Sequence, residues 1–196
     1  MAVLHVGIDY SMSCPAICIY DDAGPKFCFP NCSIYFLTPK KAFQGRFKNV
    51  IGHEHLEWAD DQQRFHQISE WALKVILGNY GDYHTKINLW MEAYSYGSKG
   101  SVFNIAENTG LLKHKLWLEK IPIQTVPPTT IKKFATGSGK GNKDPMYAAF
   151  KDKTGKSLYE LFNKDEKTVK IDSPIGDIVD SYFICEYGFS HFLKTL

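Results

Sequence analysis

The sequence predicts an α/β domain in which helices flank a mixed central sheet. Its first part holds three apolar segments separated by turn residues, the pattern of successive antiparallel strands. Farther along, short apolar segments alternate with longer ones whose apolar residues recur every three or four positions. Strands that alternate with helices favour a sheet covered by helices. With 196 residues, the chain is long enough for one domain with a substantial core, and we expect residues 1–196 to form it.

The elements follow from these patterns in order. The expected strands are residues 3–10, 16–20, 27–37, 87–91 and 121–126. The expected helices are residues 60–77, 101–120 and 129–135, one opening at 144–145 after a glycine-rich loop at 136–143, and one running from 173 toward 191. Residues 38–58 mix Lys, Gly, His and aromatic residues without a clean period, so we expect a loop-rich insertion there.

The charge distribution is more informative than the net charge of +2. Residues 129–170 hold ten Lys against five Asp or Glu, and the remainder holds thirteen Lys or Arg against sixteen acids. A basic segment beside an acidic remainder is typical of a protein that meets phosphate while holding metal. A solvated, lysine-rich surface would give the same count, so charge alone leaves both interpretations open.

Cysteine usage and hydropathy indicate an intracellular protein without a membrane partner. No stretch reaches the apolar length of a membrane span, and the first residues lack the layout of a signal peptide. The five cysteines form an odd set, which favours free thiols in a reducing compartment. They are Cys14, Cys18, Cys28, Cys32 and Cys185. The first four have spacings that invite a zinc interpretation, but they lie in or beside expected strands, which favours core thiols.

Four acidic residues occupy positions from which their side chains can converge. Asp9 closes the first apolar strand, and Glu92 closes the strand at 87–91. Asp177 and Asp180 are three residues apart near the start of the last helix, so they share one helix face. Like charges a few Å apart disfavour joint ionisation unless cations bind between them. Because Mg2+ prefers oxygen ligands of this kind, the four acids predict a metal-dependent site.

With these motifs in order along most of its length, the chain resembles the RuvC family of Holliday-junction resolvases, within the RNase H-like superfamily. Three short segments resemble the family's first strand with its metal-binding Asp, its strand-end Glu, and its Asp-x-x-Asp-Ala helix; these are residues 6–9, 91–92 and 177–181. Residues 128–143 resemble its proline–lysine–glycine–lysine segment, and residues 101–110 resemble the segment after its Glu. The chain departs from the family at Tyr10, Ser11 and Ser181 and in the extra region 38–58.

The resemblance implies an RNase H-like fold and an endodeoxyribonuclease that resolves four-way DNA junctions by paired, metal-dependent hydrolysis. It implies two Mg2+ ions, replaceable by Mn2+, bridged by Asp9, with Glu92 on one side and Asp177 and Asp180 on the other. Lys132 and Lys143 fall where the family uses two lysines near the scissile phosphate.

The same resemblance implies branched DNA and a second copy of the chain as partners, and no small-molecule cofactor. Lys133 and Lys140 are expected to hold flanking phosphates, and Tyr94, Tyr96 and Phe103 to stack or wedge at the branch point. Residues 101–120 are the expected dimer interface, with an ordinary core helix as the alternative. The departures from the family suggest a virus-encoded version; otherwise the expected place is the cytoplasm or nucleoid of a bacterial host.

Three rival functions remain open at this point. A related nuclease that cuts flaps, forks or RNA–DNA hybrids would carry the same four acids. An actin-like ATPase or sugar kinase also begins with a strand that carries Gly-Ile-Asp, although such folds need two domains. A non-catalytic DNA-binding module is the third, and four intact acids argue against it.

Overall fold

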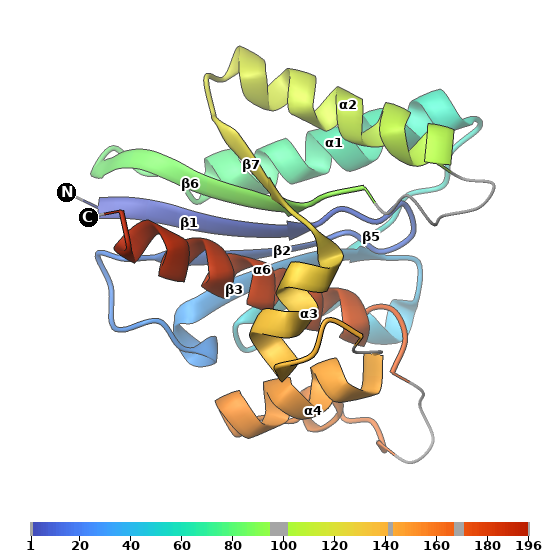
Figure 1. Ribbon diagram of the computed structural model, residues 1–196. Helices are drawn as coiled ribbons and strands as arrows, with labels where there is room; N and C mark the ends of the chain where they lie inside the picture. The colour runs from blue at the N-terminus through green and yellow to red at the C-terminus, as the bar shows by residue number, and fades with distance from the viewer. Residues whose placement is uncertain (1, 95–101, 141–142, 167–170, 196) are drawn as a thin grey trace.

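The fold is a seven-stranded mixed sheet with helices on both faces, described here from a computed structural model for residues 2–94, 102–140, 143–166 and 171–195 (Figure 1). The strands are β1 (Ala2–Asp9), β2 (Ala16–Asp21), β3 (Cys32–Thr38), β4 (Gly45–Phe47), β5 (Val50–Glu54), β6 (His84–Glu92) and β7 (Ile123–Val126). The helices are α1 (Asp61–Gly78), α2 (Val102–Leu118), α3 (Pro128–Thr136), α4 (Lys143–Thr154), α5 (Leu158–Leu161) and α6 (Ile175–Leu193), with short 3-10 helices at Phe29–Asn31 and Lys41–Phe43.

The strand order across the sheet is β4-β5-β3-β2-β1-β6-β7. The strand β2 pairs antiparallel with both β1 and β3, so the predicted antiparallel meander of the first three strands is confirmed. On its other side β1 pairs parallel with β6, and β6 pairs parallel with β7. This arrangement makes β1 a central strand, and its carboxyl end lies at the same edge of the sheet as that of β6.

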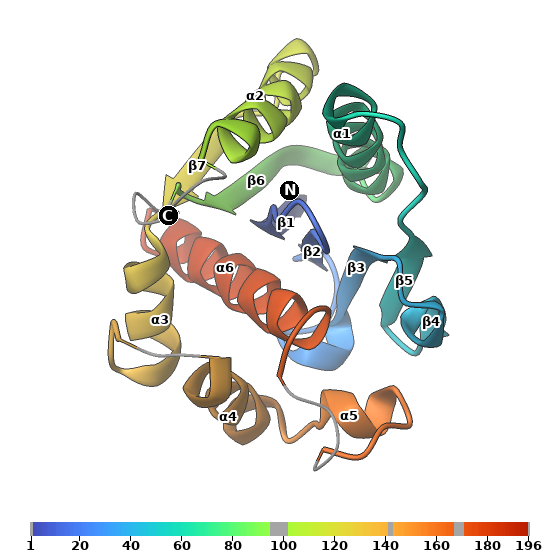
Figure 2. The same ribbon diagram turned by 90° about the vertical axis from the view of Figure 1, so that its right-hand side faces the viewer.

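The helices form a layer on each face of the sheet. Seen in Figure 2, α1 and α2 cover one face, while α6 crosses the other with α3, α4 and α5 outside it. Along β1, Leu4, Val6 and Ile8 belong to the hydrophobic core under α1 and α2. Because successive side chains of a strand point to opposite faces, Gly7 and Asp9 face α6.

The expectation of a loop-rich insertion at residues 38–58 is wrong. This region contains the 3-10 helix Lys41–Phe43 and the strands β4 and β5, joined by short connections, and its longest irregular stretch is residues 55–58. The strand β5 pairs parallel with β3, and β4 pairs antiparallel with β5. The pattern hides these strands because they are short, and because Gly52 interrupts β5 where a Cβ atom would collide with the carbonyl oxygen of Phe43.

Several boundaries also differ from the sequence expectation. The strand β3 begins at Cys32 rather than at residue 27, because Pro30 lies within a 3-10 helix that precedes it. The short helix α5 was not expected, and the expected start of α2 at Ser101 lies outside the described residues. Within the described ranges, no helix has both the length and the apolar character needed to cross a membrane.

Candidate active site

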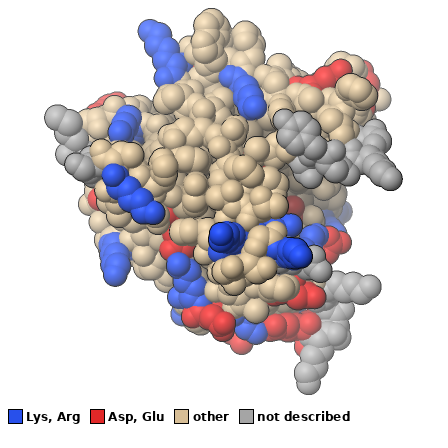
Figure 3. All heavy atoms as spheres, viewed as in Figure 1, with Lys and Arg blue, Asp and Glu red and all other residues tan. Residues whose placement is uncertain are grey.

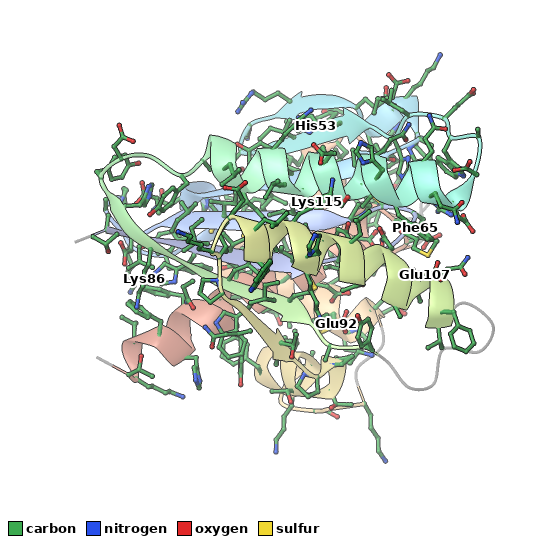
Figure 4. The ribbon with its side chains drawn as sticks, turned by 90° about the horizontal axis from the view of Figure 1, so that it is seen from above. His53, Phe65, Lys86, Glu92, Glu107 and Lys115 are labelled. Carbon is green, nitrogen blue, oxygen red and sulfur yellow. The ribbon has the colours of Figure 1, made fainter. Side chains whose placement is uncertain are left out.

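Two of the four predicted acids lie side by side at the carboxyl ends of neighbouring strands. Ile8 in β1 pairs with Met91 in β6, so the next residues along these parallel strands, Asp9 and Glu92, are neighbours across the sheet. Figure 4 shows Glu92 at the end of β6, far from Lys86 near the start of that strand. The apolar runs that form the two strands therefore fix the position of both carboxylates.

The helix α6 brings the other two acids to the same edge of the sheet. A Cβ atom on Gly7 would collide with the backbone nitrogen of Cys185 and the carbonyl oxygen of Ser181, so only glycine allows α6 to pack this closely on β1. Asp180 directly precedes Ser181 on this helix, and Asp177 lies one turn before Ser181. Both are partly buried, between the buried residues of the helix.

The four carboxylates share an environment that disfavours their charged form. Burial first, and then the charges of Asp177, Asp180 and Glu92, raise the pKa of Asp9 well above its usual range. Burial likewise raises the pKa of Glu92 and of Asp177. Burial together with the charges of Glu92 and Asp177 raises the pKa of Asp180 to about 7. Protein without cations thus resists full ionisation of this set.

The four acids offer the type of ligand atom, carboxylate oxygen, that a hard divalent cation prefers. All four are carboxylates, and Asp177 has a buried oxygen, Oδ2, that has no hydrogen-bond partner within the described part of the chain. Yet, counting only residues that the structure describes, no three His, Cys, Asp or Glu side chains are grouped closely enough to hold a metal ion. The carboxylates interact electrostatically without forming a ready-made chelating group.

Two predicted lysines lie near the carboxylates. The charge of Lys132, on α3, lowers the pKa of both Glu92 and Asp180 from the values that burial alone would give. The charge of Lys143 does the same for Asp177, and its side chain lies over Gly176. Lys143 also forms an exposed ion pair with Asp172, with 3.0 Å between Nζ and Oδ1. Exposed pairs of this kind are weak, so Lys143 can exchange this partner for another anion.

The other predicted DNA contacts are more scattered. Lys133 and Lys140 are exposed on α3 and in the turn that follows it. Tyr94 is exposed just after β6 and lies under the ammonium group of Lys113, which is 4.8 Å from its ring centroid. Phe103 is exposed at the start of α2. The prediction for Tyr96 lies outside the described residues.

The cysteines do not form a zinc site in the part of the chain that is described. All five are free thiols, and only Cys28 is exposed. Burial is the largest cause that raises the pKa of Cys18, which also interacts with Cys32 and Cys185. Cys14 is buried beside the carboxylates, and after burial the charge of Asp177 is the largest cause that raises its pKa. The four buried thiols pack as core residues.

No family model and no curated protein matches this chain. Among solved structures, RuvC from Thermus thermophilus matches with a TM-score of 0.54 at 11% identity, over 98% of this chain and 96% of that one. The same protein in complex with a Holliday junction substrate matches with a TM-score of 0.55 at 12% identity, over 98% and 96%. The chain has the RuvC fold. The yeast mitochondrial Holliday junction resolvase Ydc2 also matches, with a TM-score of 0.53 at 12% identity, over 98% of this chain and 82% of that one.

The RuvC fold confirms the predicted fold class, an RNase H-like mixed sheet flanked by helices. Sequence reasoning nevertheless missed two cations beside the acids of this RuvC-like chain. Arg64 lines a cavity of about 420 Å³ together with Asp9 and Glu92. Lys40 donates from Nζ to the carbonyl oxygen of Ser173, 2.7 Å away, just before α6. Neither belongs to a motif: Lys40 lies within residues 38–58, which resembled a loop, and Arg64 lies on the helix that follows. Only tertiary structure brings them here.

A larger cavity of about 890 Å³ lies elsewhere on the RuvC fold, between β3, β4 and α5. None of the four acids lines it, so its size does not make it the catalytic site. Basic and acidic side chains are interspersed on the face that carries α3 and α4, with no single sign covering it (Figure 3). On this face, the described residues therefore do not form one broad basic surface.

Proposed function

We propose that this chain is a metal-dependent endodeoxyribonuclease that cuts four-way DNA junctions. The observation that supports the proposal is that Asp9, Glu92, Asp177 and Asp180 lie near one sheet edge with pKa values raised by burial and, for Asp9 and Asp180, also by the neighbouring carboxylates. Carboxylates held in this state favour cations as partners. The solved structure of a RuvC bound to a Holliday junction, which shares the fold, supports branched DNA as the substrate.

In this proposal the four carboxylates would hold two Mg2+ ions, with Asp9 between Glu92 on one side and the pair from α6 on the other. Bound metal would supply a nucleophilic water and stabilise the leaving oxygen of the phosphodiester. Lys132 and Lys143 would neutralise the charge that develops on the phosphate. Lys133 and Lys140 are exposed beside them and would hold neighbouring phosphates without reading sequence.

The test is nicking of a synthetic four-way junction with Mg2+ by the wild-type protein and by Asp9→Asn and Asp180→Asn. We expect each variant to lose at least about 100-fold in cleavage rate while still binding the junction. Asp152→Asn, which removes an exposed acid on α4, is the matched control and should cut normally. Full activity in both site variants would refute the assignment. Flaps, forks and linear duplexes in parallel reactions distinguish a junction resolvase from a nuclease of other branched DNA.

We also propose that the active form is a homodimer that pairs two copies of α2. Three large apolar side chains on this helix are exposed, Phe103 by 81%, Trp117 by 70% and Leu118 by 58%, which is unusual for a monomer surface. A junction needs two symmetric cuts, and a two-fold dimer supplies two sites. Trp117→Asp should convert the dimer to a monomer in analytical ultracentrifugation, whereas Trp58→Asp, which changes an exposed tryptophan outside α2, should not. A wild-type monomer at every concentration would contradict the proposal.

A further inference from the structure

Arg64 occupies the wall of the cavity that contains Asp9 and Glu92. It lies in the first turns of α1, and the same cavity is lined by Tyr94 and Pro128. Phe65, the next residue of α1, lies toward the same end of the molecule as Glu92 and away from Lys86 (Figure 4). Arg64 thus reaches this cavity from α1, which lies on the face of the sheet opposite to α3 (Figure 2).

The guanidinium of Arg64 is held in place by two groups. Its Nη2 donates to the carbonyl oxygen of Met12, 2.9 Å away, in the loop that follows Asp9. Its central carbon lies 4.4 Å from the ring centroid of Trp58, and the His55 ring packs against that indole with 4.8 Å between centroids. The stack fixes the orientation of a side chain that is otherwise flexible.

This guanidinium has donors to spare. Its Nε is buried without a hydrogen-bond partner, and within the described ranges no carboxylate forms an ion pair with Arg64. A guanidinium has five N–H donors, and a partly buried cation with unmet donors is unfavourable until an anion binds. Arg64 lines a cavity whose other charged residues, Asp9 and Glu92, are carboxylates, so an anion that completes this set must come with the substrate.

We propose that Arg64 binds a phosphate of the DNA strand that is cut, on the α1 side of the cavity, and that Trp58 and the Met12 carbonyl are positioning groups for its guanidinium. The inference rests on the proposed function and deepens it. An Arg fork fits two phosphate oxygens at once, which a point charge cannot do. The cut strand is then contacted from α1 by Arg64 and from the opposite face by Lys132 and Lys143.

The test combines variants with single neutral phosphates in the substrate. Wild type, Arg64→Gln and Arg64→Lys are given four-way junctions that carry one methylphosphonate at successive positions of the cleaved strand. In wild type, neutralising the phosphate that Arg64 contacts should lower kcat/KM by about 10- to 100-fold. Arg64→Gln should show a similar loss on the natural junction and no further loss at that one position. The kcat/KM of Arg64→Lys on the natural junction should lie between those of wild type and Arg64→Gln, because lysine keeps the positive charge but not the two-pronged guanidinium.

Three comparisons make the outcome decisive. Arg46→Gln removes an exposed Arg on β4, outside this cavity, and should keep the wild-type profile. In Trp58→Ala, a methylphosphonate at the phosphate that Arg64 contacts should lower kcat/KM less than it does in wild type. At every other position the response should equal that of wild type. Asp9→Asn should bind junctions without cutting them, so that failure of cleavage chemistry is distinguished from loss of the Arg64 contact.

An unchanged methylphosphonate profile in Arg64→Gln, with wild-type junction cleavage, would overturn the inference and leave the proposed function standing. If wild type neither binds nor cuts any junction, the proposed function fails, and the inference fails with it. Should Arg64→Gln prove too unstable to purify, the profile of Arg64→Lys decides: a wild-type response at every phosphate overturns the inference. The salt dependence of binding should also become shallower by about one phosphate contact in Arg64→Gln.

Discussion

At the scale of single residues, the raised pKa of Asp180 links the site to stability. Its ordinary pKa is 3.8 and its value in the folded protein is about 7. Between these two values the native state binds more protons than the unfolded state, so raising the pH through this window destabilises the metal-free protein. Below about pH 4 the carboxyl is protonated in both states, and the effect vanishes. Above about pH 7 the whole destabilisation is present.

Asp180→Asn should therefore stabilise the metal-free protein at pH 8 and leave it little changed at pH 4. We expect a gain on the order of 2 kcal/mol at pH 8, which is about 4–8 °C in Tm for a chain of this size. Thermal unfolding in the presence of a chelator measures it, with Asp152→Asn as the control. A variant that melts at or below the wild-type temperature at pH 8 would show that Asp180 is not held in an unfavourable environment.

Residue-level reasoning predicted the acids and, with them, Lys132 and Lys143, but it did not predict Arg64. Asp9 and Glu92 end apolar runs, and Asp177 and Asp180 share a helix face, so local pattern alone places each of them. Arg64 has no such signal, because its position depends on how α1 packs beside the loop after β1. Which anion Lys143 meets is likewise a tertiary property: in this structure it is Asp172.

At the scale of elements, the contact between β1 and α6 determines where the late acids lie. Gly7→Ala would place a methyl group against the backbone of Ser181 and Cys185, which cannot yield as a side chain would. We expect a loss of about 3 kcal/mol or more in the free energy of unfolding. Gly78→Ala, where a Cβ atom meets nothing within 4 Å, should change little. Urea denaturation compares the two, and equal stability would mean that α6 can shift away from β1.

The predictable elements are those with long, regular patterns. The amphipathic spacing of α1 and the apolar runs of β1 and β6 are both evident from sequence, and the antiparallel meander follows from turn residues. The strands β4 and β5 are not evident from sequence. The three residues of β4 are too few to show a period, and β5 contains Gly52, where the backbone of Phe43 leaves no room for a side chain. Strands that depend on pairing with their neighbours, and that have no apolar pattern of their own, cannot be predicted from local sequence.

At the scale of the whole molecule, a divalent cation should act as a stabilising ligand. A metal that binds only the folded chain raises its free energy of unfolding by about 2.7 kcal/mol at a concentration 100 times Kd. We expect Mg2+ to raise the Tm of the wild-type protein at pH 8 by about 5–10 °C. Asp9→Asn, which removes the central carboxylate, should abolish most of the shift. An equal shift in both proteins would indicate a cation bound elsewhere.

The central position of β1 has a consequence for the durability of the site. Hydrogen-bonded to β2 on one side and β6 on the other, and covered by α6, this strand has no free edge from which to fray. Amide hydrogens around Val6 should then exchange with solvent only when the entire chain opens, at the slow limit set by global unfolding. In that case, activity and native structure should be lost at the same temperature on heating, without a folded but inactive intermediate.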